Sequence, residues 1–442
     1  MPILDNFESD YINDASESEN GLMSALDKVK LDNIRLEDIS SLSSGLADIE
    51  EYNTPRFVYG IKIDPNNSNP NTAVTYTDDA VGFIPLSINT SNGSCNYGSW
   101  KSIIENVLGV KPCLVKNDGT VLTYLDPNNY NRTINGNLID IESGLYGQVM
   151  VKFNHIYYKF SVDGTKLWFQ ISNKQIDSTW VDTAFASEDG IGTVRKEMFI
   201  AAYESCQENN TLQSLSGKTP AFNLSFDTIN ETSSFGVFHM MNIAKKQFII
   251  FLTYLVTKSI DLKTTIGNGN TRGGDILKTG TLDSCGLFYG KSADWQAVKV
   301  FGIENLWGNQ LEYMNGIIQK LVYTFDDNGN YVDEQHLFVK NFYPYDNIDN
   351  FTDLGKIDPN QSGYISTIKF LTDSLYFPDK LKGSSTTYFK SYYENGKSVD
   401  ANDRLYGIYS GNNKYDIKDG PEFLLLGNPD YKTTQITTHI VY

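Results

Sequence analysis

The sequence predicts an α+β fold in which short antiparallel strands are combined with two or so helices, behind a short N-terminal helical or coiled-coil segment. Three observations support this prediction. Many short segments alternate apolar and polar residues and are separated by turn residues, while a few repeat apolar residues every three or four positions. The 442 residues also include 28 Tyr and 24 Phe, and aromatic residues favour strands.

Strands are predicted wherever the alternation is clear and a turn follows. Residues 57–64 and a second segment from Ala73 are separated by a loop rich in Asn and Pro, which predicts two strands joined by a turn. Further strand-like segments are 113–115, 120–125, 149–153, 156–160, 167–169 and 201–203. Of these, 149–153 and 156–160 are predicted to pair with each other.

Turn residues predict where the chain reverses direction in several hairpins. Asn117-Asp118-Gly119 and Asp163-Gly164 predict tight turns. Asp326-Asp327-Asn328-Gly329-Asn330 also predicts a hairpin turn; as a calcium loop it lacks the Gly and Glu that an EF-hand places at fixed positions. Calcium at this segment or at Asp78-Asp79 is therefore possible but unsupported, and no cofactor is predicted.

Helical spacing occurs in three places. From Leu22 to Ile49 apolar residues recur every three or four positions, which fits either a helix packed on its own domain or a trimerising stalk. Residues 100–108 are predicted to be helical up to Gly109. A second helix is predicted within 235–260, running into the most apolar segment, 248–256, which is interpreted as a buried strand.

Charge and composition exclude several classes of function. The chain has 36 basic and 54 acidic residues, which gives a formal charge of −18. This negative charge repels nucleic acid and anionic membranes. The N-terminal residues show no secretory signal, and no apolar run approaches the ~20 residues of a membrane span. Neither nucleic acid nor membrane insertion is predicted.

Catalytic and metal-binding patterns are mostly missing from the sequence. The four cysteines, Cys95, Cys113, Cys206 and Cys285, form no close pair and are predicted to be free, mostly buried thiols. No two of the four histidines lie three to five residues apart, so they are interpreted as structural. The Gly-rich stretch 267–274 lacks a phosphate-loop ending and is interpreted as a surface loop that needs positive φ.

The most informative segment is 301–316, which contains Trp307-Gly308-Asn309, Glu312 and Gly316. A large indole followed by Gly-Asn predicts a buried tryptophan beside a forced turn. The segment resembles the Gly-Asn-Val-Trp-Glu-Trp signature of the C-type-lectin-like fold, which is shared by formylglycine-generating enzymes and receptor-binding proteins of bacteriophage tails. Trp307, Gly308, Asn309, Glu312 and Gly316 are the residues that carry this fold signature.

A second resemblance is more specific. Tyr59-Gly60-Ile61-Lys62-Ile63-Asp64 and Thr75-Tyr76-Thr77-Asp78-Asp79-Ala80 resemble the segment that leads into the lectin-like domain of phage structural proteins from gut bacteria. The two resemblances together imply residues 1–54 as a virion-attachment and oligomerisation segment, 55–85 as a strand-turn-strand segment, and 86–442 as a C-type-lectin-like domain. Within that domain, 317–404 is interpreted as a Tyr-rich insertion.

The function implied is that of a structural protein of a tailed bacteriophage virion, a tail-fibre or baseplate receptor-binding protein. A head or neck decoration protein is the alternative, and a surface-polysaccharide hydrolase or a divergent lectin-fold oxidase is a second one. No enzymatic activity is predicted. Formylglycine-generating enzymes use a cysteine pair near the C-terminus, and the last cysteine here is Cys285, so that catalytic arrangement is missing.

Partners follow from the same resemblance. They are other virion proteins, bound through the N-terminus, further copies of the chain in a homotrimer, and a host surface glycan or protein. The site of action is then the virion, assembled in the cytoplasm of the host bacterium. From composition alone, the candidate receptor contacts are the tyrosines of the insertion, with packing inside the protein as the alternative: Tyr343, Tyr345, Tyr388, Tyr392 and Tyr393.

Overall fold

The computed structural model of this chain describes residues 55–188, 192–271, 275–293, 295–326, 328–340, 348–358, 361–372, 374–395, 404–409, 424–427 and 436–442. The chain divides into two compact units, Met1–Arg56 and Phe57–Tyr442, and the fold given below is that of the second unit. The helix or coiled coil predicted before residue 55 lies outside the described residues.

The structure is mostly β: of the residues that it describes, 40% lie in strands and 12% in helices. The predicted α+β fold of the C-type-lectin-like type is therefore wrong, and the fold is β-rich. The reason lies in the composition, since aromatic and β-branched residues between frequent turns favour strands over nearly the whole chain.

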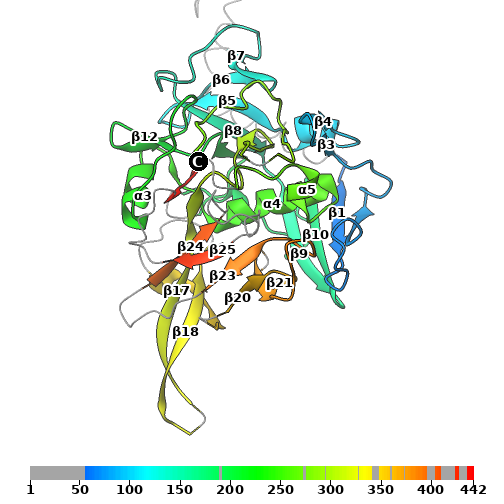
Figure 1. The fold of residues 1–442 in the computed structure, drawn as a ribbon, viewed down its shortest axis with the longest axis vertical. Helices are drawn as coiled ribbons and strands as arrows, with labels where there is room; N and C mark the ends of the chain where they lie inside the picture. The colour runs from blue at the N-terminus through cyan, green and yellow to red at the C-terminus, as the bar shows by residue number, and fades with distance from the viewer. Residues whose placement is uncertain are drawn as a thin grey trace, which may run out of the picture. The chain divides into compact units, whose positions relative to one another are not determined.

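Three larger sheets contain most of the described strands (Figure 1). The four-stranded sheet has the order β2 (Val74–Asp78), β1 (Val58–Ile63), β10 (Lys166–Ser172) and β9 (Tyr157–Asp163). The seven-stranded sheet has the order β14 (His239–Met240), β27 (Ile440–Val441), β11 (Glu197–Ala201), β8 (Gln148–Asn154), β5 (Lys111–Val115), β6 (Val121–Asp126) and β7 (Asn129–Thr133).

The eight-stranded sheet has the order β19 (Thr352–Lys356), β18 (Tyr331–Val339), β17 (Leu311–Phe325), β24 (Arg404–Tyr409), β25 (Leu424–Gly427), β23 (Tyr392–Glu394) and β20 (Ser362–Tyr364), with β26 (Ile436–Thr437) beside β17. Small two-stranded sheets are β3 (Ser87–Asn89) with β4 (Ser94–Asn96), β12 (Cys206–Glu208) with β13 (Thr211–Gln213), β15 (Lys299–Val300) with β16 (Ile303–Glu304), and β21 (Thr367–Thr372) with β22 (Leu375–Lys380).

Among the described residues, the helices are short except for one. They are the π-helical turn η2 (Ile103–Val107), the 3₁₀ turns η3 (Thr183–Phe185) and η4 (Ile348–Asn350), and the α-helices α3 (Phe226–Ser233), α4 (Ile243–Thr257) and α5 (Leu262–Thr265). In the part of the chain that the structure describes, no helix combines the length and apolar character needed to cross a membrane.

Helix α4 lies at the centre of the second unit and contacts β1, β17 and β22 (Figure 1). The buried strand predicted at 248–256 is wrong, because this run lies inside α4. All fifteen residues of the helix are buried, so its apolar residues show no one-sided period and the run cannot be told from a strand by periodicity. Asn242 caps the helix by accepting a hydrogen bond from the Lys245 N–H.

Most of the predicted hairpins are confirmed, including β1–β2, β5–β6, β9–β10 and β17–β18. One predicted pair is wrong: β8 lies between β5 and β11, whereas β9 pairs with β10 in another sheet. The chain leaves the sheet after Asn154, where the backbone N–H groups of Asn154 and His155 donate to Leu108 and Lys196. The predicted helix at 100–108 is present as the turn η2, and Gly109 follows it at φ +58°.

The region interpreted as an insertion, 317–404, contributes to the main core. Tyr376, Phe377 and Phe389 belong to the same buried cluster as the apolar residues of α4. Gln247 of α4 also donates to the Tyr376 carbonyl at 2.8 Å and accepts from its N–H at 2.9 Å. This part of the region is therefore packed onto the central helix.

Candidate functional site

Trp307 lies in the loop between β16 and β17 and is completely buried, as predicted. Its Nε1 donates to the Gly267 carbonyl at 3.1 Å. Gly308 has φ +82°, and a Cβ there would lie 2.8 Å from the backbone nitrogen of Asn270, so both the turn and the close approach require glycine. The described part of the Gly-rich stretch, 267–271, is thus a packing partner of Trp307 and not the predicted surface loop.

The other signature residues also hold the loop in place. Asn309 accepts from Asn270 Nδ2 at 2.9 Å and from the Leu277 N–H at 2.8 Å, and its own Nδ2 donates to Glu204. Gly316 has φ +90° and lies where the pairing of β17 with β24 shifts register, which is the geometry of a β-bulge. These contacts make the signature a structural element of the core.

Glu312 is fully buried in an ion network that joins three parts of the chain. Its carboxylate lies 2.9 Å from Lys246 Nζ of α4 and 2.5 Å from His439 Nδ1 near the C-terminal strand β27. Lys246 also donates to the Leu306 carbonyl at 2.7 Å. Burial by itself raises the pKa of Glu312, but the interactions with His439 and Lys246 outweigh it and lower the pKa below its ordinary value.

A second buried cluster lies nearby. Glu304 accepts the N–H groups of Gly280 and Leu282 at 3.0 and 2.7 Å, and Lys299 donates to the Leu282 carbonyl at 2.9 Å. Burial raises the pKa of Glu304 to about 7 and lowers that of Lys299. Shifts of this kind also occur in active sites. Here, however, Glu304 and Lys299 are at most 1% exposed, and each is held by backbone groups, so they support the fold.

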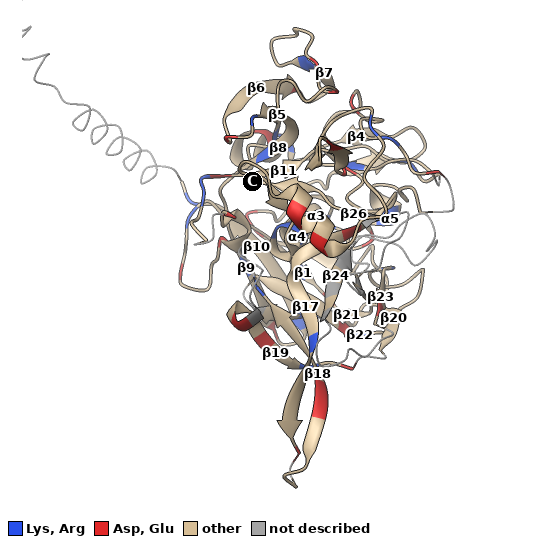
Figure 2. Cartoon of the chain, turned by 90° about the vertical axis from the view of Figure 1, so that its left-hand side faces the viewer, with Lys and Arg blue, Asp and Glu red and all other residues tan. Residues whose placement is uncertain are grey.

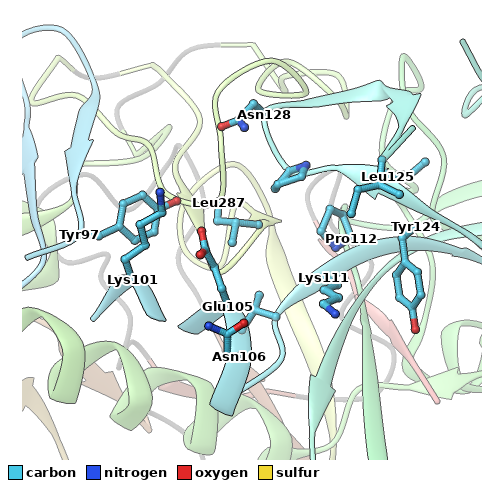
Figure 3. A pocket seen from close by; sticks show the side chains of 13 residues that line it. Tyr97, Lys101, Glu105, Asn106, Lys111, Pro112, Tyr124, Leu125, Asn128 and Leu287 are labelled. Carbon is cyan, nitrogen blue, oxygen red and sulfur yellow. The ribbon is translucent and has the colours of Figure 1, made fainter. Parts of the chain in front are cut away.

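A surface cavity of about 300 Å³ is the best-formed candidate for a binding site (Figure 3). It lies between η2, β5, β6 and the segment that follows β6. Figure 3 shows Tyr97 and Lys101 on one side, Lys111 and Tyr124 on the other, and Glu105 between them. The full lining is Tyr97, Lys101, Glu105, Asn106, Val110, Lys111, Pro112, Tyr124, Leu125, Pro127, Asn128, Ile134 and Leu287.

Local structure presents the polar groups of this cavity to solvent. In η2 the Leu108 N–H donates to the Ile103 carbonyl, the i→i+5 bond of a π-helix, a feature that is often found at functional sites. Ile103 and Ile104 are buried beneath the turn, whereas Glu105 and Asn106 are exposed. The extra residue of the π-turn thus places a carboxylate and an amide side by side at the cavity.

The aromatic residues of the cavity have defined partners. Lys111 Nζ lies 5.6 Å from the centre of the Tyr124 ring, within range of a cation–π interaction. Tyr97 packs edge-on against Phe288 at 5.8 Å. Burial, helped by the neighbouring Cys95, raises the pKa of Tyr97 to about 12, so its hydroxyl is neutral at physiological pH and can both donate and accept hydrogen bonds.

The tyrosines proposed from composition do not form this site. Tyr343 and Tyr345 lie outside the described residues. Tyr393 is only 2% exposed and packs on Phe377, so it cannot contact a receptor. Tyr388 and Tyr392 are half-buried against the two hydrophobic clusters, which agrees with the packing alternative.

The cavity residues were missed because no local pattern marks them. Lys101 and Glu105 are ordinary polar residues of a helical turn, and Lys111 and Tyr124 belong to a hairpin; only the tertiary fold brings the two together.

Cysteines and metal ligands give no further site. All four cysteines are free, as predicted, but only Cys113 and Cys206 are buried while Cys95 and Cys285 are half-buried. Among the described residues, no three His, Cys, Asp or Glu side chains are grouped so as to hold a metal ion. The Asp326 carboxylate accepts from the N–H groups of Asn328 and Asn330, as in the predicted hairpin turn.

Comparison with known proteins gives no family assignment: no protein-family model matches the chain, and no curated protein sequence matches it either.

Proposed function

We propose that this protein is a structural protein of a tailed bacteriophage virion that recognises the host cell surface, as a tail-fibre or baseplate receptor-binding protein. The virion assignment is supported by the resemblance of residues 59–64 and 75–80 to phage structural proteins. The observation that carries the recognition role is the cavity between η2, β5 and β6, where tyrosine rings and polar side chains surround about 300 Å³ of space.

The lining of the cavity suits a glycan. Rings such as Tyr97 and Tyr124 offer apolar area with a polar tip, and Asn106 and Asn128 can donate to and accept from hydroxyl groups. The volume is at the small end of the range for small-molecule sites, so the cavity accommodates about one or two sugar rings. We therefore propose a short terminal segment of a host surface polysaccharide as the ligand.

Binding is favoured over hydrolysis by the charges in the cavity. Glycoside hydrolases normally use a pair of carboxyl groups. The lining contains one carboxylate, Glu105, together with the cations Lys101 and Lys111. In this proposal residues 1–54 attach the protein to other virion proteins, and a homotrimer multiplies weak sites into avidity; no cofactor takes part.

The test is binding of the purified full-length chain to a panel of gut bacterial strains, before and after removal of surface polysaccharide. We expect polysaccharide removal to abolish binding. Glu105→Gln replaces the charged acceptor of the cavity by a neutral amide, and Asn128→Ala removes an exposed amide. We expect each to weaken binding by roughly tenfold, as for the loss of one hydrogen bond to the ligand.

Asn71→Ala is the matched control, because Asn71 is exposed in the β1–β2 loop and does not line the cavity. Equal binding by all variants would contradict the cavity as the receptor site. Association with the phage particle without binding to cells would indicate a decoration protein, and release of reducing sugar would indicate a hydrolase.

A further inference from the structure

The outer half of the β17–β18 hairpin is a two-stranded ribbon that extends beyond the eight-stranded sheet (Figure 1). β18 pairs with β17 as far as Phe325 and Tyr331. β24 accompanies β17 only as far as Lys320, and β19 accompanies β18 only as far as His336. Within the described residues, no third strand pairs with the ribbon farther out, and such ribbons gain little stability from packing.

One face of this ribbon carries a row of exposed rings. Residues directly opposite in an antiparallel pair share a face, which places Tyr323 with Asp333 and Phe325 with Tyr331. The exposed fractions are 47% for Tyr323, 69% for Phe325 and 61% for Tyr331. Tyr331 stacks on Tyr323 at 5.3 Å between ring centres and meets Phe325 edge-on at 5.4 Å.

We propose that this aromatic face, formed by Tyr323, Phe325, Tyr331 and Asp333, is a second glycan-binding site, outside the cavity. Flat rings of this kind cover the C–H faces of sugars, while the tyrosine hydroxyls supply hydrogen bonds. The Asp333 side chain is exposed, and its carboxylate makes no hydrogen bond or ion pair with the described residues, so it is available to accept from sugar hydroxyls. The source of the glycan, a neutral polysaccharide of the host surface, rests on the proposed function.

The charges around the rings disfavour two other ligands of this face, a second copy of the chain and an anionic membrane. A second copy of the chain, face to face, would bring two Asp333 carboxylates together or bury them unpaired, and both arrangements are destabilising. Acidic residues lie on β18 (Figure 2). Of these, Asp333 shares the face of the rings, and its negative charge repels an anionic membrane surface. An uncharged, hydroxyl-rich ligand meets neither obstacle.

The size of the patch agrees with a small ligand. Aromatic residues present about 150–250 Å² each, so the three rings at their observed exposure offer roughly 300–400 Å². A stable protein–protein interface needs about 800 Å² from each partner, whereas functional patches on single proteins have roughly the area found here. A glycan chain of a few sugar rings fits this area better than a protein surface does.

The test is a titration of the intact protein with chitohexaose, cellohexaose and a panel of neutral bacterial polysaccharides. Calorimetry and tyrosine fluorescence measure the binding. We expect Tyr331→Ala to weaken binding about three- to tenfold, the effect of one aromatic contact. Asp333→Asn removes only the charge and is expected to weaken binding severalfold. Thr324 and Val332 form the pair between the two pairs of the aromatic face, and their side chains lie on the opposite face of the ribbon. Thr324→Ala and Val332→Ala are therefore expected to leave binding within about twofold.

The proposal is overturned if no saccharide of the panel binds, if Tyr331→Ala binds like the wild type, or if Val332→Ala weakens binding as much as Tyr331→Ala. Sedimentation that shows self-association lost in Tyr331→Ala would assign the face to a second copy and overturn it as well.

The cell-binding experiment separates this proposal from the proposed function. Saccharide binding that depends on Tyr331, in a protein that binds no cells, leaves the aromatic site standing while the proposed function fails. If binding to cells depends on Glu105 but not on Tyr331, and the ribbon variants affect no saccharide, the proposed function stands and the aromatic site fails.

Discussion

The two halves of strand β17 depart from the usual relation between polarity and burial in different ways: the inner half buries polar residues, and the outer half exposes aromatic ones. Residues 311–319 are all buried and include the polar residues Glu312, Asn315 and Gln319. Beyond Lys320 the strand becomes exposed, and there it carries the aromatic residues Tyr323 and Phe325. The inner half thus buries three polar side chains among apolar ones, and the outer half exposes large aromatic rings; both features depart from the usual distribution.

The inner half shows how a core can contain polar residues. Gln319 accepts from Asn395 Nδ2 at 2.8 Å and donates to Gln335 at 3.0 Å, and Glu312 is paired with Lys246 and His439. Such bonds link β17 to distant parts of the chain and form only when those parts are correctly placed. The outer half has no comparable packing, and a concentration of exposed rings without a structural role is the kind of surface that binds a ligand.

The largest effect is expected for Glu312→Ala. This change leaves the ammonium group of Lys246 buried without its carboxylate and removes the carboxylate that lies beside His439, which costs about 3–5 kcal/mol in the free energy of unfolding. Urea denaturation measures it. Glu334→Ala on β18 is the matched control, because Glu334 pairs with the exposed Lys356 and exposed pairs contribute little. Equal losses in the two variants would break the contrast between the inner and outer halves.

An intermediate effect is expected from the pH dependence of Glu304. Its pKa is raised from 4.5 to about 7 in the folded protein, so between these values the folded state retains a proton that the unfolded state releases. This contribution to stability is complete below pH 4.5 and is lost as the pH rises through about 7.

Glu304→Gln lacks this titration. It also directs an amide NH₂ at one of the two backbone N–H groups that Glu304 binds, so we expect the variant to be less stable than the wild type at pH 5. The gap should narrow by on the order of 1–2 kcal/mol at pH 7. Urea midpoints at pH 5, 6 and 7 measure it, and a constant gap would show that Glu304 does not titrate in this range.

The smallest effect on stability is expected at the ribbon. Phe325→Ser and Tyr331→Ser remove exposed rings, so we expect the free energy of unfolding to change by less than about 0.5 kcal/mol, as for typical surface substitutions. The same denaturation assay measures it. A loss of 2 kcal/mol or more would mean that the rings stabilise the protein and would weaken the argument that they are kept for binding.

Local features of this fold were predictable from the sequence. The turns at 117–119 and at Asp163-Gly164 were found because Asn, Asp and Gly tolerate turn backbones whatever surrounds them. The burial of Trp307 beside Gly308 followed from the same kind of reasoning. The ribbon had a visible signal as well, since Tyr323-Thr324-Phe325 alternates next to the predicted hairpin turn, although no local pattern indicates that its rings are exposed.

Other features depended on contacts between distant residues. The apolar run 248–256 reads equally well as a strand or a buried helix, and its helical state depends on the segments that pack around α4, among them β1, β17 and β22. The partners of β8 could not be predicted, because β5 and β11 come from separate parts of the chain. The cavity was equally hidden, since its residues become neighbours only after η2 packs beside the β5–β6 hairpin.

By itself, the sequence determined the strand-rich character, the tight turns and the glycine-dependent loop after Trp307, because each follows from the conformations that a few adjacent residues can adopt. Tertiary structure decided that 248–256 is a helix, which strands pair, that Glu312 meets Lys246 and His439, and which tyrosines reach solvent. These outcomes depend on burial and on electrostatic partners, and both are properties of residues brought together from distant parts of the chain.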